Sequence, residues 1–473
     1  MRKVMFNSIP FINAGAHVGL DMMTGKVFVF SSSLFRPVRI SSSRPSTLLE
    51  LTLLPVEKVL RGEARSESAH LAYLARSDGL ASLVHLVEVI NLKEGRWFEA
   101  YIDAHSGELL SVTNFVSRAS YYAIPISKAS IAAGQEMIVD PEDYEASPLG
   151  WHNDGNANIT VTSGNNVLSF KWLDPGYAYS NGNLSNSADP SSLTFSMHYN
   201  TTLPSDNPTN LEAARTNAFY IMNVMHDVFY RYGFTEDAFN FQVTNLRGSG
   251  KTRAADPVRV SVQAEGAGPN RDGAIANDIL VHEVTHGLTQ RMTGGGTSRC
   301  LQTLEAEGLG EGWSDIMAEW VQLTGGDMRD YAFATYVAGN DKGLRTYPYS
   351  TSISTNPRRY SDVAIMNEPH DIGEVWGNIL HNILAVLIDK YGWSSAAMTD
   401  PQDLKEILCI CICSSMPYHY NHVTPLARDA FIQADAIRYN GVNKCLLWRV
   451  FARHGLGVNA ADYVDDPTIP DDC

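Results

Sequence analysis

The chain has 473 residues, and 52 aspartates and glutamates outnumber its 36 lysines and arginines, which gives a formal net charge of −16. This acidic balance argues against nucleic acid or an anionic membrane surface as a partner, and no apolar run reaches the ~18 residues that can span a membrane. The length exceeds what one ordinary core organises, so we expect two or three domains in an acidic, well-solvated monomer.

The N-terminal part of the chain carries strand patterns. Residues Leu83–Ile90 form an apolar, strand-like run, Trp97–Asp103 alternate between apolar and polar residues, and Ser106–Glu108 supply a turn. We therefore expect a β-rich domain at residues 1–118. The first residues, Met1–Asn7, are basic but lack the continuous apolar stretch and the small-residue cleavage site of a secretory signal.

Residues 119–274 are expected to form a strand-rich lobe. They are rich in glycine, asparagine, serine and threonine, with short alternating runs at Val167–Phe170 and Val258–Val262, which is typical of a sheet with many turns. One helix is predicted inside this lobe, because Leu211–Tyr232 keeps apolar residues at helical spacing and Gly233 stands where a helix should end.

Residues 275–473 are expected to form a helical lobe. Helical patterns occupy residues 275–292, about 310–323, about 371–390 and about 426–440. A strand-rich lobe followed by a helical lobe leaves a cleft between them, and the first of these helices is expected at that seam.

This first helix carries His282 and His286 one turn apart on one face, close enough for both imidazoles to hold one metal ion. Glu283 lies about 100° round the helix from His282, where a carboxylate can take a proton from a metal-bound water. The pattern predicts a zinc helix with Glu283 as the general base. The opposite, core-facing side carries apolar residues at steps of four: Leu280, Val284, Leu288 and Met292.

A catalytic zinc site needs a third protein ligand, and Glu305, Glu307 and Glu311 all follow within reach. Spacing alone does not choose, because Glu305 follows the second histidine at the distance used by one large branch of zinc aminopeptidases. Only Glu311 is followed four residues later by an acid, Asp315, on the same helical face. Such an acid can accept a hydrogen bond from a zinc-bound imidazole. We therefore expect Glu311 as the ligand, with Glu305 as the alternative.

Three stretches together resemble the fungalysin family of secreted fungal metalloendopeptidases, which are relatives of thermolysin: His282–Leu288, Thr293–Gly296 with Cys300-Leu301, and Gly308–Asp315. The likeness extends from about residue 119 to the C-terminus. It recurs in Ala146–His152, in His226-Asp227 with Arg231–Phe234, and in Arg428–Lys444.

The resemblance implies a thermolysin-like α+β peptidase of two lobes, 119–274 and 275–473, with the zinc helix at their seam. It implies a secreted zinc metalloendopeptidase that hydrolyses peptide bonds in protein substrates and is made as a zymogen. Zinc would be held by His282, His286 and Glu311, and Asp315 would orient a ligand imidazole. The sequence does not determine whether calcium also binds.

A further residue is implied for the oxyanion that forms when water adds to a peptide carbonyl. His370, in the stretch Pro369–Trp376, begins a helix and matches the family's motif for this donor. Relatives usually carry apolar or small residues where Pro369 and Asp371 stand, and a solvent-facing histidine at a helix start is the alternative interpretation.

Residues 1–118 resemble the family's propeptide, particularly at Ala14–Gly19 and Thr24–Val27. The resemblance implies that this part inhibits the peptidase until it is released near Ser117-Arg118-Ala119. The alternative is an ordinary N-terminal domain that stays attached. The resemblance also implies secretion, so we expect that a leader is missing from the sequence. Glycosylation sequons at Asn158, Asn183 and Asn200 agree with an extracellular protein.

Two alternatives to an active endopeptidase stay open. A zinc aminopeptidase would use Glu305 and require a free substrate amine. An inactive or weakly active relative would bind zinc without efficient turnover. The second alternative arises because the family carries an extended edge-strand segment before the zinc helix, whereas here Gln263–Pro269 leads almost directly to Arg271–Gly273.

The six cysteines also divide by position. Cys300, Cys445 and Cys473 stand at family-like positions, and in an oxidising compartment at least one pair of the six should be bridged. The apolar run Ile407–Cys413 contains the other three cysteines and departs from the family's pattern there.

Overall fold

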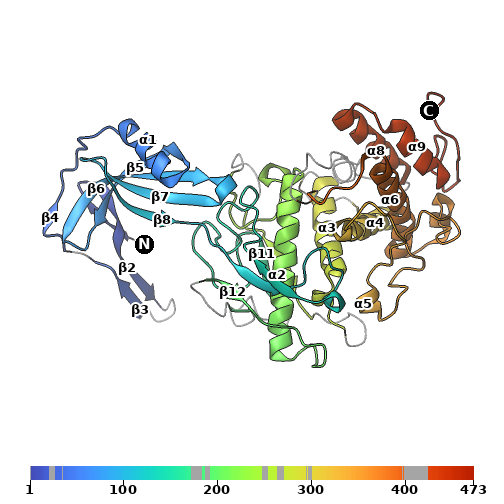
Figure 1. Ribbon diagram of the computed structural model, residues 1–473, viewed down its shortest axis with the longest axis horizontal. Helices are drawn as coiled ribbons and strands as arrows, with labels where there is room; N and C mark the ends of the chain where they lie inside the picture. Colours follow the sequence, from blue (N-terminus) through green and yellow to red (C-terminus); the bar gives the residue numbers. More distant parts are fainter. Residues whose placement is uncertain are drawn as a thin grey trace. The chain divides into compact units, whose positions relative to one another are not determined.

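A computed structural model describes two compact units of the chain (Figure 1). Met1–Val116 and Pro148–Gly150 form the first, and Ser117–Ser147 and Trp151–Cys473 form the second. The described residues are 2–20, 27–34, 36–171, 184–186, 192–247, 254–263, 271–293, 296, 301–396, 398 and 424–473. Some predicted features lie outside these residues: the departure from the family at 264–270, the sequon at Asn183, and the cysteines Cys300, Cys409, Cys411 and Cys413.

The first unit is built on an antiparallel-rich sheet in the order β1-β2-β5-β6-β7-β8, with β3 paired to β2 and β4 paired to β6. Its central strands, β6 and β7, contain the two predicted strands and pair antiparallel along their length. The bounds are β1 Arg2–Phe6, β2 Ile9–Leu20, β3 Val27–Ser32, β4 Arg39–Ile40, β5 Glu63–Ala75, β6 Leu80–Asn91, β7 Arg96–Asp103 and β8 Leu109–Asn114.

One helix, α1 (Glu50–Leu60), packs against this sheet. Val56 and Leu60 share a buried cluster with Val87, Val89 and Ile102 of β6 and β7. Burying such side chains contributes about 1.5–3 kcal/mol each, so this contact fixes the helix on the sheet. A short 3₁₀ helix, η1 (Leu92–Glu94), joins β6 to β7.

The strands of the second unit are short. β9 (Ser120–Ala123) pairs with β10 (Glu136–Val139) and β12 (Thr194–Phe195), and β11 (Val167–Phe170) pairs in parallel with β13 (Val258–Ser261). Much of the described chain between them is turn and loop, with 3₁₀ helices η2 (Ile131–Ala133), η4 (Glu236–Ala238) and η5 (Gly273–Ile275). The predicted strands at 167–170 and 258–262 are therefore present and pair with each other in one small sheet.

The long helix α2 (Pro208–Arg231) organises this lobe and is buried along most of its length. It begins at Pro208, three residues before the predicted start at Leu211, where the Asn207 side chain accepts the N–H of Thr209 and Pro208 occupies the first turn. It ends before Gly233, whose φ of 103° few other residues tolerate. The helix packs on β9, β11 and the next helix, α3.

The helical lobe follows from residue 277. Its helices are α3 (Asn277–Thr293), α4 (Leu304–Gln322), α5 (Thr335–Ala338), α6 (Pro369–Tyr391), α8 (Thr424–Tyr439) and α9 (Lys444–Arg453), with the 3₁₀ helix η6 (Tyr360–Ile365). α4 packs against both α3 and α6, and α3 contacts α2 on its other side (Figure 1). The order of elements confirms the expected α+β fold.

The predicted start of α4, at about residue 310, is wrong. The helix begins at Leu304, where the Thr303 hydroxyl accepts the N–H of Ala306. The glycines at 308, 310 and 312 hid this first turn from the sequence pattern, because glycine is a weak helix former. The early start places Glu305 and Glu307 on the same helix as Glu311.

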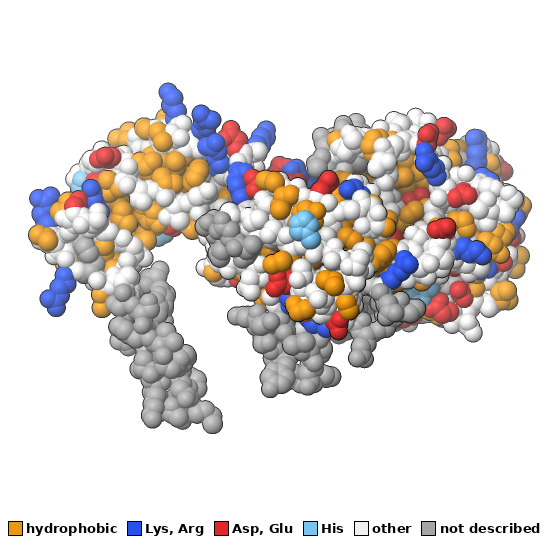
Figure 2. Space-filling view, turned by 60° about the horizontal axis from the view of Figure 1, so that its bottom comes forward, with side chains coloured by type: hydrophobic (Ala, Val, Ile, Leu, Met, Phe, Trp, Pro, Cys, Tyr) orange, Lys and Arg blue, Asp and Glu red, His pale blue; other side chains and the backbone are white. Residues whose placement is uncertain are grey.

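One continuous hydrophobic core joins the two lobes of the second unit and includes residues of α2, α3, α4 and α6. A disulfide between Cys445 and Cys473 ties α9 to the C-terminus, which confirms that at least one cysteine pair is bridged. Among the described helices, none combines the length and the apolar character that a bilayer crossing needs. On the face drawn in Figure 2, acidic and basic side chains are interspersed.

Candidate active site

The zinc helix predicted from the sequence is α3, and its first residue is anchored deep in the strand-containing lobe. The Asn277 side chain is fully buried and donates to the carbonyls of Ile124, Pro125 and Lys128 at 2.9–3.1 Å. The Asn217 amide of α2 donates to its side-chain oxygen at 3.1 Å. These hydrogen bonds fix the start of α3. They therefore also fix the direction in which the side chains of its later turns point.

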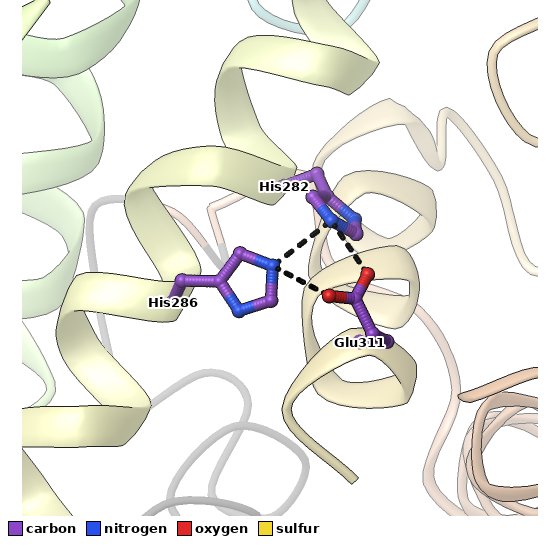
Figure 3. Close-up of side chains that lie close together, drawn as sticks. All are labelled: His282, His286 and Glu311. Atoms are coloured by element: carbon purple, nitrogen blue, oxygen red, sulfur yellow. Dashed lines mark hydrogen bonds and ion pairs between the residues drawn. The ribbon is translucent and has the colours of Figure 1, made fainter. Parts of the chain in front are cut away.

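His282 and His286 project from one face of α3 toward Glu311 of α4 (Figure 3). The Nε2 atoms of the two histidines are 3.0 Å apart. Nε2 of His282 lies 3.1 Å from Oε2 of Glu311, and Nε2 of His286 lies 3.4 Å from Oε1. Among the described residues, these three form the single group of histidine, cysteine or carboxylate side chains whose ligand atoms all lie within 4.8 Å of one another.

Close packing of glycines sets the position of Glu311. A Cβ atom on Gly312 would lie 2.7 Å from the backbone nitrogen of Gly377 and 2.8 Å from the carbonyl of Gly373. A Cβ on Gly373 would lie 2.5 Å from the Cβ of Glu311. Side chains at these positions would push α4 and α6 apart, so the glycines allow the close approach of the two helices that carry the site.

Asp315 holds the ring of His282. Its Oδ1 accepts from Nδ1 of His282 at 2.8 Å, and the side chain is completely buried. Burial opposes the charged form of His282, but the hydrogen bonds to Asp315 and Glu311 outweigh it and raise the pKa of His282 to about 9. Burial likewise opposes the charge on Asp315, but Arg345 and His282 hold the pKa of Asp315 at about 2. The carboxylate therefore stays ionised and keeps Nδ1 of His282 protonated, so that Nε2 faces Glu311.

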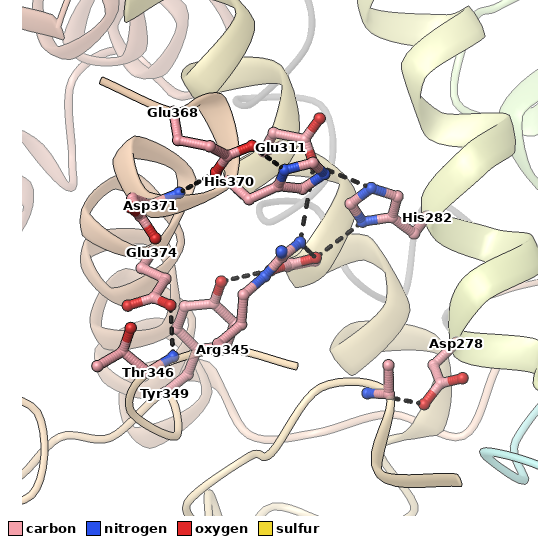
Figure 4. A network of polar contacts seen from close by, with 12 residues as sticks. Asp278, His282, Glu311, Arg345, Thr346, Tyr349, Glu368, His370, Asp371 and Glu374 are labelled. Carbon is pink, nitrogen blue, oxygen red and sulfur yellow. Dashed lines mark hydrogen bonds and ion pairs between the residues drawn. The ribbon is translucent and has the colours of Figure 1, made fainter. Parts of the chain in front are cut away.

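Sequence reasoning missed Arg345 and Tyr349, which complete this network (Figure 4). Arg345 donates to both oxygens of Asp315, at 2.6 and 2.8 Å, and the Tyr349 hydroxyl donates to Asp315 as well. Both residues come from the irregular segment between α5 and η6, where no periodic pattern or motif marks them. The one signal in the sequence was that Arg345 lies between two predicted helices that carry acidic residues.

His370 stands at the start of α6 and does reach the site. Its Nε2 lies 3.4 Å from Oε2 of Glu311, and its Nδ1 contacts the carboxylate of Glu368. The side chain is 53% exposed. Glu368 also caps α6 by accepting the N–H of Asp371 at 3.1 Å. Pro369 and Asp371, where the resemblance led us to expect apolar or small residues, lie in the first turn of the helix.

Glu283 follows His282 on α3 and is exposed. Within the described part of the chain, its side chain has no hydrogen bond or ion pair with another residue. An exposed carboxylate without a structural partner is free to exchange protons with solvent or substrate.

Glu305 does not join the histidines. Its buried carboxylate accepts from the N–H of Thr424 at 2.9 Å and from the hydroxyl of Tyr463 at 3.1 Å. Glu307 is exposed on the helix surface. The geometry thus separates the three candidate glutamates, and Glu311 is the one that lies beside both histidines.

The grouping of His282, His286 and Glu311 fits a divalent cation. Two imidazole nitrogens face each other at 3.0 Å, and Oε2 of Glu311 is buried 3.1 Å from one of them, on His282. Two nitrogens and a carboxylate oxygen that converge on one point are the donor set of a catalytic zinc site.

Comparison with known proteins agrees with this chemistry. A sequence profile of the fungalysin metallopeptidase family (M36) matches residues 120–268 and 264–460. The extracellular metalloproteinase mep of Aspergillus fumigatus is 35% identical, over 91% of this chain and 72% of its own length. The extracellular metalloproteinase MEP of Pyricularia oryzae is 32% identical over 96% and 82%, and extracellular metalloproteinase 1 of Phaeosphaeria nodorum is 35% identical over 84% and 68%.

Proposed function

This chain belongs to the fungalysin family of metallopeptidases, and from that premise we propose that it is a secreted zinc endopeptidase, made as a zymogen, that hydrolyses peptide bonds in proteins. The observation that carries the proposal is the convergence of His282, His286 and Glu311 on one point. Secretion is supported by the names of the relatives, which are extracellular metalloproteinases.

The three converging side chains would hold the zinc ion. Bound there, zinc would lower the pKa of a water ligand and polarise the carbonyl of the scissile bond. Asp315 would keep His282 in the orientation that ligation needs, since its hydrogen bond to Nδ1 leaves Nε2 available. Arg345 keeps Asp315 charged and fixed.

Two further side chains would act on the substrate. Glu283 would take the proton of the attacking water and pass it to the leaving amine, because its carboxylate is exposed and adjacent to His282 in sequence. His370 would donate a hydrogen bond from Nε2 to the oxyanion of the tetrahedral intermediate. The contact of its Nδ1 with Glu368 supports this role, since the carboxylate holds the ring in an orientation in which Nε2 points toward Glu311.

The first compact unit would act as the propeptide. Its boundary at Val116 lies two residues from the expected end at 118. Adding residues 1–117 at micromolar concentration to the processed peptidase should therefore reduce hydrolysis of casein. If the rate is unchanged at that concentration, the N-terminal unit is not an inhibitor.

A weakly active relative is the second candidate function. The match to the family profile is split into two segments that overlap at 264–268, where we expect the sequence to lack part of the family's edge-strand segment. In thermolysin-like enzymes an edge strand here holds the substrate in extended form through backbone hydrogen bonds. Zinc content and casein hydrolysis, measured together on the processed chain, separate the two functions, because the weak relative would bind zinc but cleave slowly.

The aminopeptidase alternative receives no support from the geometry, since Glu305 is engaged by Thr424 and Tyr463. Cleavage of peptides with blocked N-termini tests this point. An endopeptidase cleaves them as well as free peptides, whereas an aminopeptidase does not.

A further inference from the structure

Glu142 is a buried carboxylate without a partner. Its side chain is 6% exposed, and neither of its oxygens accepts a hydrogen bond from any residue that the structure describes. Burying an unpaired carboxylate is costly, and proteins normally pair such a group or bind a cation with it. The proposed peptidase mechanism makes no use of Glu142.

The acids around Glu142 are all engaged. Asp140 contacts Arg118 at 3.2 Å, and Asp143 accepts from Arg231 at 2.7 Å. The carboxylate of Asp227 is saturated by the Trp151 indole at 2.8 Å, the Ser147 hydroxyl at 2.6 Å, the N–H of Asp143 at 3.0 Å and the His226 ring at 2.9 Å. Glu142 thus differs from its neighbours because no hydrogen bond or ion pair within the described structure holds its carboxylate, and the Arg118 guanidinium acts on it only at longer range.

The backbone of Ala119 lies opposite Asp140, two residues before Glu142. In the antiparallel pair β9·β10, Ser120 faces Val139, and Asp140 donates to the carbonyl of Ala119 at 2.9 Å. Ala119 is itself buried, at 1% exposure. Burial is the largest influence on Glu142 and raises its pKa to about 8, while the backbone N–H of Ala119 acts in the opposite direction by favouring the charged form.

We propose that the peptide bond between Arg118 and Ala119 is the processing site of the precursor, and that Glu142 binds the α-ammonium group that cleavage creates on Ala119. The proposal rests on the proposed zymogen function and specifies how the zymogen is converted. Hydrolysis breaks the bond between the carbonyl carbon of Arg118 and the nitrogen of Ala119. Water supplies the hydroxyl of the new Arg118 carboxyl group and one proton of the new amine, which takes a further proton from solvent.

Cleavage would place a positive charge near Glu142. A backbone amide offers one N–H and no charge, whereas an α-amino group, with a pKa of about 7.7–8.0 in peptides, offers three N–H donors and a positive charge. Because burial raises the pKa of Glu142 to about 8, the precursor holds this side chain at neutral pH mainly as a neutral acid without a partner, whereas the new ammonium group would pair with its charged form in the mature peptidase. The new pair stabilises the processed form relative to the precursor and opposes detachment of the new N-terminus.

The residues around the bond between Arg118 and Ala119 differ in their exposure. The Arg118 side chain is 49% exposed and suits a protease that cleaves after a basic residue. Ser117 and Ala119 are buried, and the Ser117 hydroxyl donates to Asn158 at 2.7 Å. The processing protease therefore acts when this short segment detaches locally, as chain segments at domain boundaries do.

The test compares the full-length chain with its Glu142→Gln variant, which keeps the shape of the side chain but removes the charge. Glu136→Gln is the matched control, because Glu136 is exposed on β10 and lies 4.0 Å from Lys128. In each chain a recognition sequence for a specific processing protease replaces residues 115–118 and keeps arginine at 118. The thermal midpoint is measured before and after cleavage, with both fragments present.

We expect Glu142→Gln to leave the precursor as stable as before or more stable, and to lower the midpoint of the cleaved protein by several degrees. Glu136→Gln should change neither form. An equal effect of Glu142→Gln on the two forms would overturn the proposal.

A second readout concerns the new amine. In the cleaved protein the Ala119 amine should react slowly with an amine-acylating reagent, and in the cleaved Glu142→Gln variant it should react at least tenfold faster. Mass spectrometry of the naturally processed protein should find Ala119 as the first residue, and a different first residue contradicts the assigned bond. If cleavage does not raise the activity of the precursor, the zymogen function fails. If activity rises but the amine is equally reactive in both proteins, the role of Glu142 alone fails.

Discussion

Nδ1 of His282 donates to Oδ1 of Asp315 across 2.8 Å, and this bond joins the helix that carries both histidines to the helix that carries Glu311. Asp315 is also held by Arg345 and Tyr349. The orientation of the His282 ring therefore depends, through Asp315, on Arg345 and Tyr349, which lie more than fifty positions further along the sequence.

The first prediction tests this bond. Asp315→Asn should weaken zinc binding on the order of 10–100-fold, because the amide no longer fixes the protonation of His282. It should also destabilise the fold by about 3–5 kcal/mol, since the buried Arg345 charge would keep only the longer contact with Glu311, at 3.7 Å. Zinc affinity by chelator competition and the thermal midpoint are the measurements.

Asp327→Asn is the control for this prediction, because Asp327 is exposed just beyond α4. Tyr349→Phe is a milder variant for the case in which Asp315→Asn does not fold, since it removes one hydrogen bond to Asp315 and leaves its charge paired. Unchanged zinc affinity in both Asp315→Asn and Tyr349→Phe would contradict the role given to Asp315.

The second prediction separates the candidate ligands. Glu311→Ala should lose zinc and casein hydrolysis together, because it removes one of the three converging side chains. Glu305→Gln should keep the zinc. It should lower the stability of the fold, because it weakens the hydrogen bonds that Thr424 and Tyr463 donate to this side chain. Metal content and hydrolysis of the two variants decide between them, and the reverse pattern would return the ligand role to Glu305.

The third prediction concerns pH. In the folded precursor the pKa of Glu142 is about 8, against 4.5 for an ordinary glutamate, mainly because of burial, with Asp140 and Asp227 adding to the shift. The folded state holds this proton more tightly than the unfolded chain, so stability should fall as the pH rises from about 4.5 to about 8.

Glu142→Gln should therefore raise the thermal midpoint of the uncleaved chain more at pH 8 than at pH 5. Denaturation curves of the variant and the unaltered precursor across this range provide the measurement. A difference between the two proteins that does not change with pH would mean that Glu142 does not titrate in this window.

The fourth prediction concerns the departure from the family before α3. Inserting a relative's segment between Gly266 and Pro269 should raise kcat/KM on casein by orders of magnitude, because positioning of a substrate can supply about 7–11 kcal/mol of a barrier. Zinc content should not change, since the three residues proposed as ligands, His282, His286 and Glu311, lie downstream. If the unaltered chain already cleaves casein as fast as a full-length relative, the inserted segment is unnecessary and this prediction is wrong.

The sequence predicted the parts of the site that follow helical periodicity. The four-residue spacing of His282 and His286, and of Glu311 and Asp315, places each pair on one helix face, and the structure brings the two faces together. The start of α4 was missed because Gly308, Gly310 and Gly312 interrupt the helical pattern directly after its first turn. These glycines serve the contact with α6, which is tertiary information that a local pattern does not carry.

Other features could not be read from the sequence at all. Arg345 and Tyr349 come from an irregular segment, and only the folded chain places them on Asp315. Glu142 is one acid in a run of polar residues, and its burial and its position beside Ala119 depend on the pairing of β9 with β10. Long-range pairing of this kind has no periodic signature.

The central claim, that this site hydrolyses peptide bonds with zinc and Glu283, is tested most directly by one paired measurement on Glu283→Gln. Zinc content and casein hydrolysis are determined on the processed variant and the processed unaltered chain. The variant should bind one zinc ion per chain and lose hydrolysis by a factor on the order of 10²–10⁴, because an amide preserves shape but cannot accept the proton of water. A variant that retains both its zinc and most of its hydrolysis would contradict the claim.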